Sequence, residues 1–162
     1  VMIAISISPR PKLLLADEPT TALDVTTQEQ ILALLMELQA EEGMAIVLVS
    51  HDLGVISETC DEVVVMYAGR MLEAGFDRDV MRAPRHPYTR GLIEAMPSLE
   101  VSDEEPPVPI PGQPPNLAAL PPGCPFQPRC EFARPGCERI PVALDSALAE
   151  HGSACPFVGG RQ

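Results

Sequence analysis

The first half of the chain alternates between short continuous apolar runs and a helical repeat. Residues 13–17 and 45–50 are apolar almost throughout, as in strands that are buried on both faces of a parallel sheet. Between them, apolar residues recur at the i, i+3, i+4, i+7 spacing of an amphipathic helix, at Ile31, Leu34, Leu35 and Leu38. Asp24 or Thr26 is suited to cap the start of this helix, and Gly43 to end it. Two strands joined by a helix of about 15 residues predict a βαβ crossover, so we expect an α/β fold.

Shorter elements are expected on both sides of this crossover. They are a helix end at 1–8, a short helix at 53–60, a hairpin at 62–67 and 70–73 around Ala68-Gly69, and helical stretches near 78–82 and 88–95. The first helix has no cap residue ahead of it. We therefore expect the chain to be a fragment; a late start at Met2 is the alternative.

Composition divides the chain into three parts. Residues 1–96 carry the α/β pattern. Nine of the 26 residues from 97 to 122 are proline, which predicts an extended linker with no packed core of its own. Residues 123–162 hold four of the five cysteines and few large apolar residues, so we expect a small cysteine-containing extension there.

Charge and hydropathy exclude several classes of function. The chain has 11 Lys and Arg against 23 Asp and Glu, a formal net charge of −12. A nucleic-acid partner is not expected, because such proteins present a basic surface. No apolar run reaches the roughly 18 residues of a membrane-spanning helix, and no signal peptide opens the chain. We expect a reducing, cytosolic setting, in which cysteines are thiols or metal ligands rather than disulfides.

Two adjacent carboxylates, Asp17 and Glu18, follow the first predicted strand. Open parallel sheets bind ligands at the carboxyl ends of their strands. In P-loop nucleotide hydrolases an Asp at such an end holds the Mg²⁺ that bridges the phosphates, and a second acid can act as general base toward the attacking water. The alternative is a pair of solvated acids in a loop.

The residues around this pair resemble the ATP-binding-cassette (ABC) ATPases. The letters DEPTTALD, from Asp17 to Asp24, are similar to the Walker B strand end and D-loop of that family, and VSHD around His51 is similar to its switch-histidine segment. The resemblance implies the C-terminal part of a P-loop nucleotide hydrolase domain that uses ATP and Mg²⁺. It implies that Asp17 supports Mg²⁺ and that Glu18 is the general base. It also implies that His51 contacts the γ-phosphate and the attacking water, and that Asp24 faces a second ATPase subunit.

Two motifs of the family are absent from the sequence. There is no G-x-x-x-x-G-K-[ST] to cradle the phosphates, and no glycine-rich signature loop. The opening residues resemble the stretch that directly follows the signature motif, so we expect the C-terminal half of a subunit. We expect the isolated chain to be inactive. The alternatives are a non-transport ABC ATPase and a truncated, non-enzymatic metal-binding remnant.

A later segment resembles the oligopeptide and dipeptide importers among ABC proteins. APRHPYTRGL, which contains His86, and IPGQPPNL, which begins at Ile110, are similar to the His-Pro-Tyr segment and the proline-rich stretch of that branch. The resemblance implies an energy-coupling ATPase subunit at the cytoplasmic face of the membrane. Its partners would be a second ATPase subunit, two membrane permeases and, indirectly, a substrate-binding protein. Nickel and glutathione importers belong to the same branch, so the substrate stays open.

Four cysteines lie close together near the end of the chain. Cys124, Cys130, Cys137 and Cys155 have the spacing C-x5-C-x6-C-x17-C, which fits neither structural zinc pairs nor ferredoxin motifs. The tail resembles the extension of peptide-importer ATPases in which a four-iron cluster is implied in some members. A [4Fe-4S] cluster, zinc, and free or disulfide-bonded thiols are the three alternatives. Cys60 is expected to be a packed residue outside this group.

Overall fold

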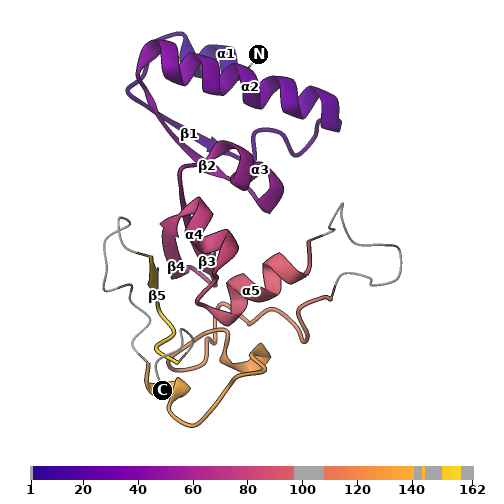
Figure 1. The fold of residues 1–162 in the computed structure, drawn as a ribbon, viewed down its shortest axis with the longest axis vertical. Helices are drawn as coiled ribbons and strands as arrows, with labels where there is room; N and C mark the ends of the chain where they lie inside the picture. Colours follow the sequence, from indigo (N-terminus) through magenta and orange to yellow (C-terminus); the bar gives the residue numbers. More distant parts are fainter. Residues whose placement is uncertain (1, 97–107, 141–143, 145–150, 158–162) are drawn as a thin grey trace. The chain divides into compact units, whose positions relative to one another are not determined.

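The computed structural model describes residues 2–96, 108–140, 144 and 151–157, which belong to two compact units, Val1–Cys60 and Asp61–Gln162 (Figure 1). Helices and strands are present in both units. None of the helices in the described ranges is long and apolar enough to cross a membrane. The division of the chain at residues 96/97 and 122/123 stays a prediction.

The first unit is built on a βαβ crossover, as predicted. Strands β1 (Leu13–Asp17) and β2 (Ala45–Val49) are parallel neighbours, and helix α2 (Val25–Glu42) connects them (Figure 1). The register pairs Leu13 with Ala45 at one end and Asp17 with Val49 at the other. The carboxyl ends of the two strands therefore lie at the same edge of the sheet.

Helix α2 begins and ends where its cap residues predict. The Asp24 side chain accepts a hydrogen bond from the backbone N–H of Thr27, which satisfies one of the free donors of the first turn. These contacts with Thr27 hold the pKa of Asp24 below its ordinary value. At the other end Gly43 has φ +64° and its N–H donates to the carbonyl of Gln39.

Burial in the first unit differs from the sequence prediction in two respects. Leu14 and Ala16 of β1 are buried, but Leu15 is 71% exposed, so the strand is covered on one face and not on both. On α2, Leu34 is exposed while Leu32 is buried. The reason is that the described part of this unit packs on one side of the sheet only, where Leu14, Leu35 and Met44 form a core with residues of α1 (Met2–Ile7). Helix α3 (Leu53–Thr59) follows β2.

The second unit begins with the predicted hairpin. Strands β3 (Glu62–Tyr67) and β4 (Arg70–Phe76) are antiparallel, with a register shift between Val65 and Met66. The two turn residues, Ala68 and Gly69, both have positive φ, as a type I′ turn requires. The short strand β5 (Gly152–Ser153) pairs with β4 and adds a third strand.

The hairpin and the cysteine-bearing segment share one core. Leu72 of β4 is fully buried, and Tyr67, Phe126 and Ala154 pack with it. Around this core lie helices α4 (Asp77–Arg82) and α5 (Pro87–Glu94) and two 3₁₀ turns, η1 (Gln127–Arg129) and η2 (Cys137–Arg139).

Part of the proline-rich stretch contacts this unit. Ile110 packs against the core, and the guanidinium of Arg129 donates to the carbonyls of Ile110 and Pro111. Residues 108–122 contain neither a helix nor a strand, whereas 97–107 lie outside the described residues. The linker as a whole stays a prediction.

Candidate functional site

The two carboxylates lie at the carboxyl end of β1, next to the end of β2. The backbone N–H of Glu18 donates to the carbonyl of Val49, which extends the sheet pairing by one step. Glu18 itself has φ +45°. This left-handed conformation is unfavourable for a residue with a side chain, and such strain is often found at functional sites.

His51 and Glu18 are in direct contact, although 33 positions separate them in the sequence. Nδ1 of His51 lies 2.9 Å from Oε1 of Glu18, and the hydroxyl of Thr21 donates to Oε2 at 2.9 Å. These two hydrogen bonds, His51 first, hold the pKa of Glu18 below its ordinary value. The side chains of His51 and Glu18 are 72% and 44% exposed, so a ligand can reach both.

The two other predicted residues of this site behave differently. Asp17 ends β1 beside Val49 and is exposed. Asp24 is engaged in capping α2, with its second oxygen accepting from the hydroxyl of Thr27 at 2.8 Å. The structure therefore brings together Glu18 and His51 on adjacent strand ends. An exposed carboxylate next to an imidazole can take a proton from water and stabilise a charge that develops nearby.

The four cysteines of the second unit line one small cavity of about 20 Å³. The same cavity is lined by His86, Phe126 and other apolar residues. Cys137 is buried and the other three cysteines are partly buried. Burial raises the pKa of the Cys124 and Cys130 thiols.

Short turns and one glycine bring these cysteines together. Cys130 directly follows η1 and Cys137 begins η2, while Cys155 lies two residues after β5. The N–H of Cys124 donates to the carbonyl of Cys137, which joins the two loops. Gly123 makes this approach possible, because a Cβ at that position would overlap the backbone of residues 137 and 138.

The donor set of this cavity fits a metal centre in composition. Four thiols converge on one cavity, and Cys60 belongs to the other unit, at the end of α3. Within the described ranges, no three metal-binding side chains already lie at ligating distances from a common point.

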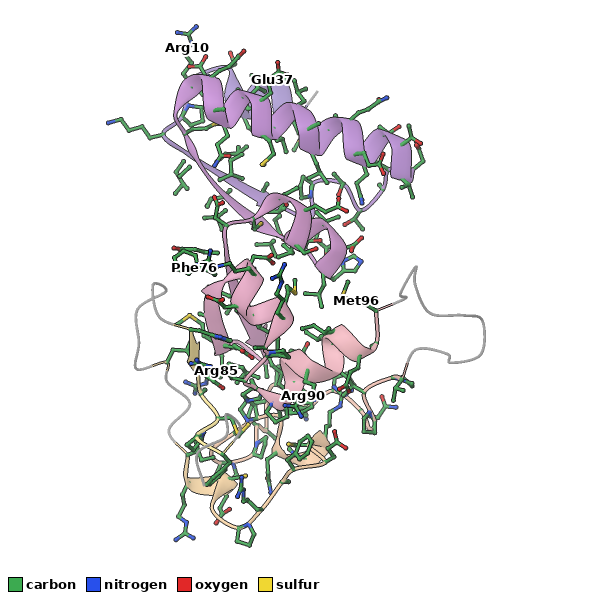
Figure 2. The ribbon with its side chains drawn as sticks, in the orientation of Figure 1. Arg10, Glu37, Phe76, Arg85, Arg90 and Met96 are labelled. Atoms are coloured by element: carbon green, nitrogen blue, oxygen red, sulfur yellow. The ribbon has the colours of Figure 1, made fainter. Side chains whose placement is uncertain are left out.

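Sequence reasoning missed a buried carboxylate that organises this unit. Glu73 is fully buried in β4 and accepts hydrogen bonds from the backbone N–H groups of Arg85 and His86 at 2.7 and 2.8 Å. Its Oε1 also lies 2.6 Å from Nε2 of His151. Arg85, labelled in Figure 2 ahead of α5, donates from its guanidinium to the carbonyl of His151. The signal in the sequence was an acid within an otherwise apolar strand.

Thr21, His86 and Gly123 were also missed as members of these sites. Thr21 and Gly123 have no chemistry of their own that a sequence pattern would reveal. The sequence places His86 in the His-Pro-Tyr segment, and its position at the cysteine cavity depends on the tertiary fold.

Comparison with known proteins identifies the family. The model of the C-terminal region of oligopeptide/dipeptide transporters matches residues 72–137. Oligopeptide transport ATP-binding protein OppD from Haemophilus influenzae is 55% identical over 141 residues, 87% of this chain and 43% of that relative. The OppD proteins of Salmonella typhimurium and Escherichia coli are 56% and 55% identical over the same share of this chain, which covers 42% of each. The chain thus spans less than half the length of these relatives. It belongs to the oligopeptide/dipeptide transporter family of ATP-binding proteins, of which it carries the C-terminal region.

Proposed function

We propose that this chain is the C-terminal part of the ATP-hydrolysing, energy-coupling subunit of an ABC importer for peptides. The observation that carries this proposal is the hydrogen bond between Glu18 and His51 at the ends of two parallel strands. A carboxylate and an imidazole at this edge are suited to act on a phosphoanhydride and its attacking water. The high identity to oligopeptide transport ATP-binding proteins supports the same function.

Each residue of the site has a distinct role in this proposal. Asp17 would hold the Mg²⁺, which supplies charge neutralisation at the phosphates. Glu18 would take the proton of the attacking water, and Thr21 and His51 orient its carboxylate. His51 would also face the γ-phosphate. Asp24 would lie in the D-loop toward a second ATPase subunit while its side chain caps α2.

The partners follow from the same family. We infer a second ATPase subunit, two membrane permeases and, indirectly, a substrate-binding protein, with this subunit held peripherally at the cytoplasmic face of the membrane. The isolated 162-residue chain should neither bind nor hydrolyse ATP, because its sequence contains no phosphate-binding loop. Equilibrium dialysis with labelled ATP tests this, and micromolar binding by the isolated chain would contradict it.

Substitution of the proposed base tests the catalytic assignment. In the complete transporter in lipid vesicles, Glu18→Gln should keep ATP binding and lose most hydrolysis and peptide uptake, because an amide does not take a proton from water. Glu29→Gln is a matched control, since Glu29 is an exposed acid of α2 outside this site. Hydrolysis by Glu18→Gln within a few-fold of the parent would refute the role of the base. ATP hydrolysis without coupled peptide uptake would instead point to a non-transport ABC ATPase.

We further propose that Cys124, Cys130, Cys137 and Cys155 hold one [4Fe-4S] cluster. Four thiolates match the ligand count of such a cluster, and all four line the same cavity. The cluster would staple loops whose only regular structure in the described residues is short 3₁₀ turns and β5.

Metal analysis of anaerobically purified protein decides between the alternatives. Iron and acid-labile sulfide in equal amounts, with absorption that disappears when any one of the four cysteines is replaced by Ser, support the cluster. Cys60→Ser is the control and should leave the absorption intact, because Cys60 lies in the first unit. Stoichiometric zinc without sulfide would refute the cluster.

A further inference from the structure

His86 lies at the wall of the cysteine cavity and is held there from several sides. Its side chain is 1% exposed and lines the same cavity as the four cysteines. Its backbone N–H donates to the buried carboxylate of Glu73. Its ring lies beside that of Phe126, with 6.1 Å between the ring centroids. The imidazole is therefore packed in one position.

The hydrogen bonds of this ring determine which nitrogen carries the proton. His86 caps α5, and its Nδ1 accepts the backbone N–H of Tyr88 at 3.1 Å. An accepting Nδ1 has a free lone pair, so the proton of the neutral ring is on Nε2. That nitrogen lies 3.9 Å from the sulfur of Cys124. His86 thus presents a donor, and not an acceptor, to a sulfur of the cavity.

We propose that His86 is a positioning residue of the cysteine site, whose Nε2–H donates a hydrogen bond to the sulfur of Cys124 and thereby tunes the metal centre bound there. The inference rests on the proposed cluster. It gives the histidine of the His-Pro-Tyr segment a second role besides capping α5. It also connects the start of α5 to the cysteine-bearing loops through one side chain.

A donor at this position has a defined electrostatic effect. Hydrogen bonds to cluster sulfurs are among the features that set the reduction potential of an iron–sulfur protein. Reduction adds a negative charge to the cluster, and a donor to a ligand sulfur stabilises that charge more than it stabilises the oxidised form. His86 should therefore make the cluster easier to reduce.

The substitution His86→Asn separates the two roles of the side chain. Asn is among the best residues for capping a helix, and its Oδ1 takes the place of Nδ1 as acceptor for Tyr88. Its shorter side chain has no donor at the position of Nε2. The matched control is His151→Asn, the same change at another partly buried histidine of this unit, which contacts Glu73.

The protein is expressed at the full length of its reading frame, purified anaerobically and titrated electrochemically. We expect His86→Asn to keep its iron and sulfide and to have a lower reduction potential than the parent. A tenfold lower ratio of reduced to oxidised cluster at a fixed potential corresponds to a shift of about 59 mV for a one-electron couple. His151→Asn should titrate like the parent. An unchanged potential in His86→Asn, or an equal change in both variants, would overturn the proposal.

A spectroscopic measurement keeps the test independent of variant folding. In the parent protein labelled with ¹⁵N-histidine, pulsed electron paramagnetic resonance of the reduced cluster should detect one weakly coupled nitrogen, absent from His86→Asn. No coupled histidine nitrogen in the parent would refute the hydrogen bond even if the variant failed to fold. Absence of iron and sulfide from the parent would refute the cluster itself, and the role of His86 with it.

Discussion

The substitution Gly123→Ala tests how the cysteine site is assembled. Gly123 has φ +74°, in the left-handed region that side chains disfavour. A Cβ added there would lie 2.5 Å from the carbonyl carbon of Glu138 and 2.7 Å from its oxygen, and closer still to the carbonyl oxygen of Cys137. These neighbours are backbone atoms, so the overlap is relieved only if one cysteine-bearing loop moves away from the other.

The expected loss of stability in Gly123→Ala follows from comparison with a second glycine. Gly69 has nearly the same φ of +73°, but a Cβ there would meet nothing within 4 Å. Both Ala variants should lose about 1–2 kcal/mol of the free energy of unfolding, because alanine is strained in the left-handed conformation. Gly123→Ala should lose about 1–3 kcal/mol more, because overlap of this kind forces backbone shifts. The hydrogen bond from Cys124 N–H to the Cys137 carbonyl would be weakened at the same time.

The assay measures how often the cavity opens. In metal-free protein, the alkylation rate of the buried Cys137 thiol follows the population of locally opened chains. An extra 1–3 kcal/mol corresponds to an alkylation rate about 5- to 150-fold faster in Gly123→Ala than in Gly69→Ala. Cys60, in the other unit, is the internal reference and should react equally in both variants. Equal rates at Cys137 in the two variants would refute the steric argument.

Three further outcomes are expected. Thr21→Ala should raise the pKa of Glu18 toward its ordinary value in an NMR titration, because one of the two hydrogen bonds that lower it is lost. Since His51 and Thr21 lower this pKa in the folded chain, the stabilisation they give is present above the ordinary pKa and is lost as the pH falls through the lowered one. Asp24→Ala should lower the urea concentration at which the chain unfolds, through loss of the α2 cap, whereas Asp24→Asn should leave it nearly unchanged. Glu73→Ala should lower the free energy of unfolding by about 2 kcal/mol or more, because two backbone N–H groups lose their buried acceptor. A smaller loss of stability than in Asp24→Ala would contradict this.

Local signals in the sequence determined where helix α2 begins and ends and that β1 and β2 pair in parallel. Asp24 and Gly43 delimit α2 because their capping geometry depends on a few neighbouring residues. The apolar runs at β1 and β2, separated by one helix, required a parallel pair. Since parallel strands place their carboxyl ends at one edge, Glu18 and His51, which follow β1 and β2, lie close together, although the sequence assigns His51 only through the family resemblance.

Other features were decided only by the tertiary structure, because they depend on groups distant in sequence. Leu15 is exposed because the described part of its unit covers one face of the sheet, which an apolar run does not reveal. The cysteine spacing did not specify a cavity; the close approach at Gly123 and the pairing of β5 with β4 bring those loops together. His86 contacts the sulfur of Cys124 across 38 positions, since the burial of Glu73 holds the start of α5 against the same core. The burial of a residue and the proximity of distant segments depend on many contacts across the fold, so a local sequence pattern does not predict them.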